Sequence, residues 1–208
     1  MPLEIQTVAC GVYQANAYLV SRRDSERAVL IDPGDALSDL RAMLARSGKK
    51  LEAILLTHGH FDHILAAQPL SEATGATVYI HAGDAEMLSD SFRSAYSSEV
   101  CSLQPPKDLP YQIYPEGILT LADIPFEVLH TPGHSKGSVC LYIREEKLLF
   151  SGDTLFRAGF GRMDLYGGSP AQMRDSLRSL FALPRETRVY PGHGDLTGIG
   201  TESTRYHI

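Results

Sequence analysis

The sequence predicts a mixed α and β fold, in which one or two β-sheets present polar loops at one edge. Short apolar runs with strand composition recur along the chain, helical patterns lie between them, and no repeat or long linker divides the 208 residues. A chain of this length with 43% hydrophobic residues can bury a large core. We therefore expect residues 1–208 to form a single domain.

Strands are predicted where short runs are dominated by aliphatic, β-branched and aromatic side chains. These runs cover residues 17–22, 28–32, 51–56, 77–80, 126–130, 139–143, 148–150 and 187–189. Apolar runs of this kind without polar alternation are typical of strands buried in a sheet. So many strands imply one or two sheets.

Helices are predicted at residues 37–46, 62–68 and 170–181. The second is expected to end before Pro69, because the residue that precedes a proline is disfavoured in a helix. The third has Ser169 as a cap and Pro170 at its first position, followed by an apolar stripe. Residues 89–116 are rich in Pro and Tyr with little periodicity, so they form either a binding loop or lid, or a surface excursion.

The charge balance argues against nucleic acid as a partner. The formal net charge is -6 and the pI is about 5.7, whereas proteins that bind a phosphate backbone present clustered Lys and Arg. The first residues have neither a basic nor an apolar signal region, and no stretch approaches the ~20 apolar residues that span a bilayer. We therefore expect a cytoplasmic protein without membrane contact, while the oligomeric state leaves no readable pattern.

The most informative segment is Thr57-His58-Gly59-His60-Phe61-Asp62-His63, which places three imidazoles and one carboxylate within a few consecutive positions. Such a string arises by chance on the order of once in a thousand chains of this length. It follows the apolar run 51–56, and alternation along an extended backbone lets His58 and His60 point the same way. Gly59 allows the loop to bend between them. Asp62 and His63 begin the predicted helix, whose positive dipole end favours a carboxylate.

Three further loops place one His or Asp just beyond a predicted strand and beside glycine. They are Thr131-Pro132-Gly133-His134, Ser151-Gly152-Asp153-Thr154 and Tyr190-Pro191-Gly192-His193-Gly194. A single loop histidine is usually a solvated or hydrogen-bonded residue, but four strand ends that deliver seven ligand-type groups indicate one shared site. The candidate metal ligands are therefore His58, His60, Asp62, His63, His134, Asp153 and His193.

In this order and with these local sequences, the seven residues resemble the metallo-β-lactamase superfamily, from Asn16-Ala17-Tyr18-Leu19 to His193. Two segments further resemble its glyoxalase II-like branch, in the short bacterial form without the C-terminal helical domain, since only 15 residues follow His193. They are Ser151-Gly152-Asp153-Thr154-Leu155-Phe156 and Gly161-Arg162-Met163-Asp164-Leu165-Tyr166-Gly167-Gly168. The resemblance implies an α+β fold, a four-layer αβ/βα sandwich of two mixed β-sheets, with a dinuclear metal site at one edge.

The resemblance also implies how the ions are held. By the family pattern, His58, His60 and His134 hold one ion, Asp62, His63 and His193 hold the other, and Asp153 bridges them. The two ions are what the resemblance implies, whereas the ligand type by itself indicates the kind of metal: imidazoles and carboxylates without thiolate suit divalent ions such as Zn(II), Fe(II) or Mn(II), with zinc slightly favoured. The scattered cysteines predict neither a disulfide scaffold nor a thiolate metal site.

Such a pair of ions predicts a hydrolase. Ions ~3.5–4 Å apart share a hydroxide, and metal binding lowers the pKa of water from about 15.7 to about 7. At about 1.36 kcal/mol per pKa unit this is roughly 12 kcal/mol, far more than a histidine base supplies at neutral pH. The predicted nucleophile is therefore a metal-bridging hydroxide, and Asp62 is predicted to be catalytic by taking its proton. No Gly-x-Ser-x-Gly elbow is present.

The predicted substrate is a small-molecule thioester, S-lactoylglutathione or a related acyl-thiol. In the family, a basic residue and a tyrosine after the bridging aspartate help to hold glutathione. Arg162 matches the basic residue, and Asp164 stands where the tyrosine is expected. Arg162 and Asp164 are therefore the candidate substrate-binding residues, and a surface ion pair between them is the alternative.

Other functions fit parts of the pattern. A persulfide dioxygenase with a single iron resembles this chain at His58, His134 and Asp153, although Pro191-Gly192-His193-Gly194 is the hydrolase-like form. A lactonase would use the same ligands, and a non-enzymatic metal-binding domain would keep the fold without turnover. Hydrolysis of β-lactams is disfavoured, because secreted lactamases commonly carry Cys where this chain has Asp153.

Overall fold

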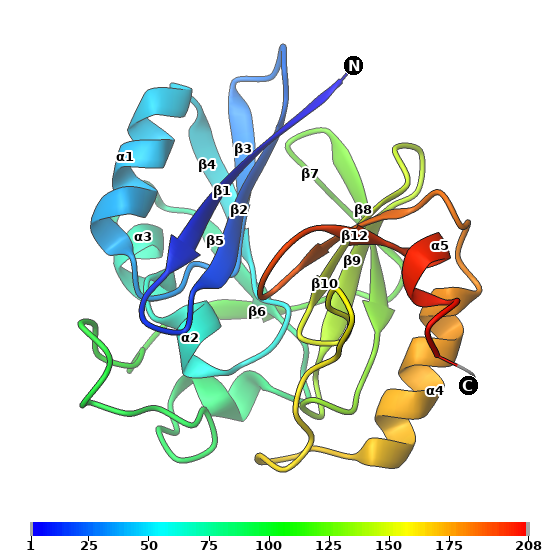
Figure 1. The fold of residues 1–208 in the computed structure, drawn as a ribbon. Helices are drawn as coiled ribbons and strands as arrows, with labels where there is room; N and C mark the ends of the chain where they lie inside the picture. Colours follow the sequence, from blue (N-terminus) through cyan, green and yellow to red (C-terminus); the bar gives the residue numbers. More distant parts are fainter. Residues whose placement is uncertain (1, 207–208) are drawn as a thin grey trace.

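The computed structural model describes residues 2–206 and contains two six-stranded β-sheets that share a core (Figure 1). The first sheet has the order β1 (Leu3–Cys10), β2 (Ala15–Arg22), β3 (Arg27–Ile31), β4 (Lys50–Leu55), β5 (Thr77–Ile80) and β6 (Tyr111–Ile113). The second has the order β12 (Thr197–Gly198), β11 (Arg188–Pro191), β10 (Leu148–Gly152), β9 (Val139–Ile143), β8 (Ile124–His130) and β7 (Ile118–Leu121). Parallel neighbours run from β3 to β6 and between β10 and β11, so both sheets are mixed.

Helices cover the outer faces of both sheets. The first sheet is covered by α1 (Leu37–Ser47) and α3 (Ala67–Thr74), and the second by α4 (Pro170–Phe181) and α5 (Ile199–Glu202) (Figure 1). The short helix α2 (Phe61–Ile64) and the 3₁₀ helix η1 (Ala85–Leu88) belong to the loops at the sheet edge. The expected four-layer αβ/βα sandwich of two mixed sheets is confirmed. Within residues 2–206, no helix has the length and apolar character needed to cross a membrane.

Three hydrophobic cores separate the four layers, and they explain why the central strands are apolar on both faces. In β2, Leu19 packs in the core shared with α1 and α3, whereas Tyr18 and Val20 pack between the two sheets. The third core joins the second sheet to α4. Phe150 is fully buried in the middle core, so truncating it to alanine is expected to lower the free energy of unfolding by about 3–5 kcal/mol. A strand buried on both faces loses its polar alternation and becomes a continuous apolar run.

Every predicted strand is present, with its ends moved by at most two residues. The strands that the apolar runs did not predict are β1, β6, β7 and β12, and these are the four edge strands of the two sheets. All residues of β6 are exposed, and β1 and β7 are exposed in part. An edge strand contributes fewer residues to the cores, so it carries no apolar run. Because β6 lies within residues 89–116, that segment is not wholly irregular.

The helix predicted over residues 62–68 is wrong in its extent. Instead, α2 ends at Ile64 and α3 starts at Ala67, with Pro69 inside its first turn. The amide of Ala66 donates to the carbonyl oxygen of Pro33 rather than continuing the helix. Pro69 is tolerated because amides in the first turn have no partner within the helix. The helices predicted at 37–46 and 170–181 are confirmed, and Ser169 Oγ accepts the amide of Gln172 as the predicted cap.

Candidate metal centre

The seven predicted donor side chains converge at one edge of the two sheets, on loops that follow four different strands. We call this set the donor cluster, and it comprises His58, His60, Asp62 and His63 after β4, His134 after β8, Asp153 after β10 and His193 after β11. Both sheets therefore contribute to one site, and rigid strand ends hold each loop in place.

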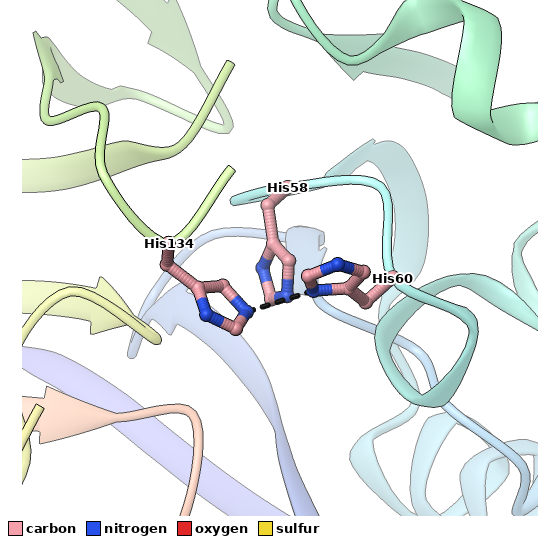
Figure 2. Close-up of side chains that lie close together, drawn as sticks. All are labelled: His58, His60 and His134. Carbon is pink, nitrogen blue, oxygen red and sulfur yellow. Dashed lines mark hydrogen bonds between the residues drawn. The ribbon is translucent and has the colours of Figure 1, made fainter. Parts of the chain in front are cut away.

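Three histidines, His58, His60 and His134, form the first donor group, and their rings point at one another (Figure 2). They are at most 3% exposed, and one nitrogen of each lies within 4.8 Å of the others. The closest atoms are His60 Nδ1 and His134 Nε2, 2.7 Å apart. Burial lowers the pKa of His58 well below its usual range and that of His60 to about 3. Both imidazoles are therefore neutral, which is the form that binds metals.

The second donor group consists of Asp62, His63 and His193. His193 Nε2 lies 3.3 Å from Asp62 Oδ2 and 3.3 Å from His63 Nε2. Burial opposes the charged forms, but His63 and His193 hold the pKa of Asp62 below its usual range. For His63, burial alone would lower the pKa, but the carboxylates of Asp62, Asp153 and Asp32 outweigh burial and raise the pKa to about 10. This group is thus rich in negative charge, which a bound cation would neutralise in place of the His63 proton.

Asp153 lies between the two donor groups. Its Oδ2 is 3.5 Å from His134 Nε2 in the first group and 3.6 Å from His193 Nε2 in the second. Its Oδ1 is 3.4 Å from His63 Nε2. A carboxylate that reaches both groups suits the sharing of one ligand by two neighbouring ions.

Asp32, a residue that the motif analysis did not select, orients two of the histidines from behind. Thr57 Oγ1 donates to Asp32 Oδ2 over 2.6 Å, so this hydroxyl accepts the Nδ1 hydrogen of His58, 3.0 Å away. The Nδ1 hydrogen of His63 is donated to the same Asp32 oxygen over 3.1 Å. Asp32 also lies close enough to His58 and His63 to be grouped with them as a ligand, but these hydrogen bonds make it an outer partner that leaves each Nε2 free.

Backbone carbonyls orient two more histidines in the same way. Nδ1 of His134 donates to the carbonyl oxygen of Arg162 over 2.7 Å, and Nδ1 of His193 donates to that of Tyr13 over 3.0 Å. In both rings the hydrogen therefore lies on Nδ1, and the Nε2 lone pair faces the cluster. Outer acceptors of this kind fix the tautomer and the direction of metal-binding imidazoles.

Unpaired polar atoms inside the cluster test whether a metal fits. His58 Nε2 and Asp153 Oδ1 are buried and make no hydrogen bond among the described residues. Buried polar atoms of this kind are rarely left without a partner, because each lost hydrogen bond is costly. Neutral imidazoles and carboxylates at these positions are the ligands that Zn(II), Fe(II) or Mn(II) accept. The donor set therefore fits divalent metal ions.

The cluster opens into a cavity of about 450 Å³, which leaves room for a small molecule above the donors. We call the lining residues outside the donor cluster the rim, and they are Tyr13, Phe61, Ala95, Phe156, Gly161, Arg162 and Leu165. Most of the rim is apolar. A neighbouring cavity of about 570 Å³ shares Ala95 and Leu165 with the first, so the two spaces adjoin along these residues.

The two predicted substrate-binding residues lie at this opening and bind each other. The guanidinium of Arg162 donates two hydrogen bonds of 2.7 Å to the carboxylate of Asp164. Both side chains are exposed, at 63% and 67%, and the contact holds the pKa of Asp164 at about 2. Arg162 lines the cavity above the donors and Asp164 lines the adjoining one. The alternative of a surface ion pair is thus observed, while their binding of substrate stays a prediction.

Sequence reasoning missed two buried carboxylates behind the donors, Asp32 and Asp84. Each follows a strand of the first sheet and is at most 1% exposed. Asp32 stands before Pro33-Gly34, which is the same strand-end pattern that singled out Asp153 beside Gly152. That pattern was a usable signal for Asp32. Asp84 follows Gly83 beyond β5 in the same way that His134 follows Gly133 beyond β8, so the same signal was available for it.

Residues 10–193 match the family model of the metallo-β-lactamase superfamily, and the chain belongs to this superfamily. Its fold is similar to the crystal structure of BLEG-1 B3 metallo-β-lactamase, with 36% identity, a TM-score of 0.88 and 97% of each chain covered. It is also similar to the crystal structure of TTHA1623 in a di-iron-bound form, with 43% identity and a TM-score of 0.86 over 95% of this chain and 96% of that one.

Among curated proteins, the hydroxyacylglutathione hydrolase of Ectopseudomonas mendocina is 37% identical over 190 residues, covering 91% of this chain and 65% of that protein. The superfamily, the donor cluster and this relative together support a metal-dependent hydrolase that acts on a small molecule. Divalent metal binding follows from the same observations. The number and identity of the ions and the substrate belong to the proposal below.

Proposed function

We propose that this protein is a dinuclear metal-dependent hydrolase of thioesters, with zinc as the leading metal and iron or manganese as alternatives. The observation that carries the proposal is the position of Asp153, within 3.6 Å of histidine nitrogens of both donor groups. His58, His60 and His134 would hold one ion, Asp62, His63 and His193 the other, and Asp153 both. When bound, such ions activate water as a nucleophile and polarise a carbonyl oxygen.

The described lining residues include no Ser, Cys, Thr or Lys, so none of these four side chains is available as a covalent nucleophile. Asp62 is held ionised by the neighbouring His63 and His193, which lower its pKa. An ionised carboxylate is able to accept a proton from the attacking water and pass it on, although the low pKa makes Asp62 a weak base. Asp62 thus orients water and relays a proton, in addition to contributing a donor oxygen.

The leaving group favours a thioester over other acyl compounds. A thiol has a pKa of about 8.5, so it departs as a thiolate without prior protonation. An alcohol or amine departs only when an acid supplies a proton. Apart from the donor side chains, Tyr13 supplies the only hydroxyl group among the described lining residues. A thioester therefore makes the smallest demand on this cavity, compared with a lactone or a β-lactam.

The composition of the rim favours an acyl-thiol with apolar groups over S-lactoylglutathione. Phe61, Phe156 and Leu165 offer apolar contact, and the adjoining cavity adds Phe92, which is 87% exposed. Arg162 is the cation that the family pattern assigns to glutathione, and here Asp164 pairs with it. Glutathione carries two carboxylates, and neutralised Arg162 attracts them weakly.

The cytoplasmic location expected from the sequence stays a prediction.

A thioester panel tests this proposal. Purified, metal-loaded protein is given S-lactoylglutathione, S-butyryl-N-acetylcysteamine, a γ-lactone and a cephalosporin, and released thiol or ring opening is measured. We expect thiol release, with kcat/KM for the butyryl compound at least equal to that for S-lactoylglutathione. His134→Ala should abolish it, whereas His130→Ala, an exposed histidine outside the donor cluster, should not. No thiol release from either thioester would refute the assignment.

The alternatives give different results in the same experiment. A lactonase would open the lactone in preference to both thioesters. A persulfide dioxygenase would contain one iron per chain and consume oxygen with glutathione persulfide, without releasing thiol from thioesters. A non-enzymatic metal-binding domain would load two ions and turn over none of these compounds.

A further inference from the structure

Asp84 is a fully buried carboxylate that touches two of the loops carrying the donor cluster, yet it is not a donor itself. It is 0% exposed and lies between β5 and η1. Neither the family pattern quoted above nor the proposed reaction uses it. Its contacts show what it does to the first donor group.

The first contact is with the loop that carries His58 and His60. Asp84 Oδ2 accepts the amide hydrogen of Gly59, the residue between these two histidines, over 3.0 Å. Gly59 is also pressed against η1, because a Cβ atom there would lie only 2.6 Å from Met87 Cβ. The backbone between the two ligands is therefore fixed by one carboxylate oxygen and by close packing.

The second contact is with the loop that carries His134. Ser135 Oγ donates to the same Asp84 Oδ2 over 2.5 Å, and the amide of Gly137 donates to Oδ1 over 2.6 Å. A Cβ atom on Gly137 would lie 2.5 Å from the Asp84 amide nitrogen, so this loop also packs directly on the residue. A single oxygen, Oδ2, thus joins the loop of His58 and His60 to the loop of His134.

The carboxylate accepts from neutral donors only among the described hydrogen bonds and ion pairs. Burial raises its pKa, since the negative charge is kept from water without a paired cation. A buried group of this kind costs stability, so a need for its geometry would explain its presence. Here it is needed, because asparagine offers one oxygen and cannot accept at both carboxylate positions.

We propose that Asp84 is a positioning residue for the first donor group, which holds His58, His60 and His134 at the spacing that one metal ion requires. The proposal rests on the metal assignment of the proposed function, and not on the substrate. Removing an outer partner of a metal ligand typically lowers the metal affinity by about 10–100-fold. The effect should fall on the first donor group alone, since Asp84 makes no hydrogen bond to Asp62, His63 or His193 among those observed.

The test is a titration of metal-free protein with Co²⁺ in a competing chelator, which yields two stepwise affinities and a visible spectrum. His60→Ala and His193→Ala serve as references that identify the first and second sites. We expect Asp84→Asn to weaken the same step as His60→Ala by at least about tenfold, and to leave the step lost in His193→Ala within about twofold. Ser135→Ala, which removes one donor and preserves the carboxylate, should weaken the first step severalfold.

A matched control separates positioning from a general loss of stability. Glu202 is also 0% exposed. It accepts hydrogen bonds from the Ala158 amide and the Thr197 hydroxyl, neither of which belongs to the donor cluster. Glu202→Gln should lower the thermal midpoint and leave both affinities unchanged.

Equal affinities in Asp84→Asn and the parent, or a parallel fall at both steps, would overturn the proposal while the metal assignment survives. A parent protein that binds no Co²⁺ would overturn both. If Asp84→Asn does not fold, Ser135→Ala decides the question by itself, because an unchanged first step in that variant contradicts the joining role of Oδ2.

Discussion

The donor cluster and the rim are adjacent parts of one cavity, and they are built in opposite ways. In the donor cluster, four histidines each donate the Nδ1 hydrogen to a fixed oxygen acceptor. Some buried polar atoms of the cluster make no hydrogen bond among the described residues. The rim is mostly apolar, and its charged residue, Arg162, pairs with Asp164 of the adjoining cavity, both side chains being more than 60% exposed. Under the proposed function, the chemistry would depend on preorganised buried groups and the choice of substrate on surface residues that each contribute little.

The largest effect should come from the residue between the two donor groups. Asp153→Asn removes the charge that reaches both of them, and kcat should fall more than about a hundredfold, since even outer partners are worth 10–100-fold. Asp164→Asn is a change of the same kind in the exposed pair, and it should change kcat by less than about threefold. Steady-state kinetics on one thioester measures both variants. Comparable losses in the two would erase the distinction between cluster and rim.

Metal binding should stabilise the fold through the cluster alone. A ligand at a hundredfold its Kd adds about 2.7 kcal/mol per site, which corresponds to a rise in Tm of roughly 5–10 °C for a chain of this size. Thermal unfolding with and without a chelator measures this rise. The rim variant Leu165→Ala should show the full rise and Asp153→Asn only part of it. A chelator without effect on the parent would contradict the coupling.

Asp32→Asn should weaken metal binding about 10–100-fold without altering any donor. Asparagine cannot accept from the Thr57 amide, the Thr57 hydroxyl and His63 together, so His63 loses its fixed tautomer. Chelator competition measures the affinity. Thr57→Val keeps the shape but removes the hydroxyl that donates to Asp32 and accepts from His58, and it should give a loss in the same direction. Full affinity in Asp32→Asn would show that the outer hydrogen bonds are dispensable.

In the rim, Leu165→Ala should raise KM for an apolar thioester about threefold with kcat unchanged, because the lost contact is made equally in the ground and transition states. The same change should leave KM for S-lactoylglutathione nearly constant. Kinetics on the two substrates gives both values. A fall in kcat would instead place Leu165 among the groups that act in the reaction.

The smallest expected effect concerns the ion pair of Arg162 in the rim with Asp164 in the adjoining cavity. Asp164→Asn frees the Arg162 guanidinium, and kcat/KM for S-lactoylglutathione should rise about twofold relative to a neutral thioester, in keeping with the small energies of exposed pairs. The gain should disappear in 0.5 M salt, where screening is strong. A gain that is equal for charged and neutral substrates would point to a change of shape rather than of charge.

Strands were predictable from the sequence where both of their faces are buried, and they were not predictable at the edges of the sheets. Strands β2, β4 and β10 appear in the sequence as apolar runs because cores lie on both sides of them. The edge strand β6 is fully exposed, and its hydrogen bonds to β5 depend on a partner far away in the chain. A local pattern cannot report such a partner.

The candidate site divides in the same way. The donors share one loop or lie beside glycine at strand ends, so residue type and spacing indicated all seven. Asp84 acts through the amides of Gly59 and Gly137, and backbone contacts between distant segments leave no residue pattern. The pairing of Arg162 with Asp164 was anticipated as an alternative, and the structure decides it by placing both on one exposed loop.

Elemental analysis of the protein purified from metal-supplemented medium tests the central claim most directly, with His134→Ala and His130→Ala measured beside the parent. The two histidines belong to the same strand-to-loop segment, but only His134 faces the donor cluster. The account predicts about two divalent ions per chain in the parent and in His130→Ala, and about one in His134→Ala. A parent protein without bound metal, or equal metal content in all three proteins, would contradict it.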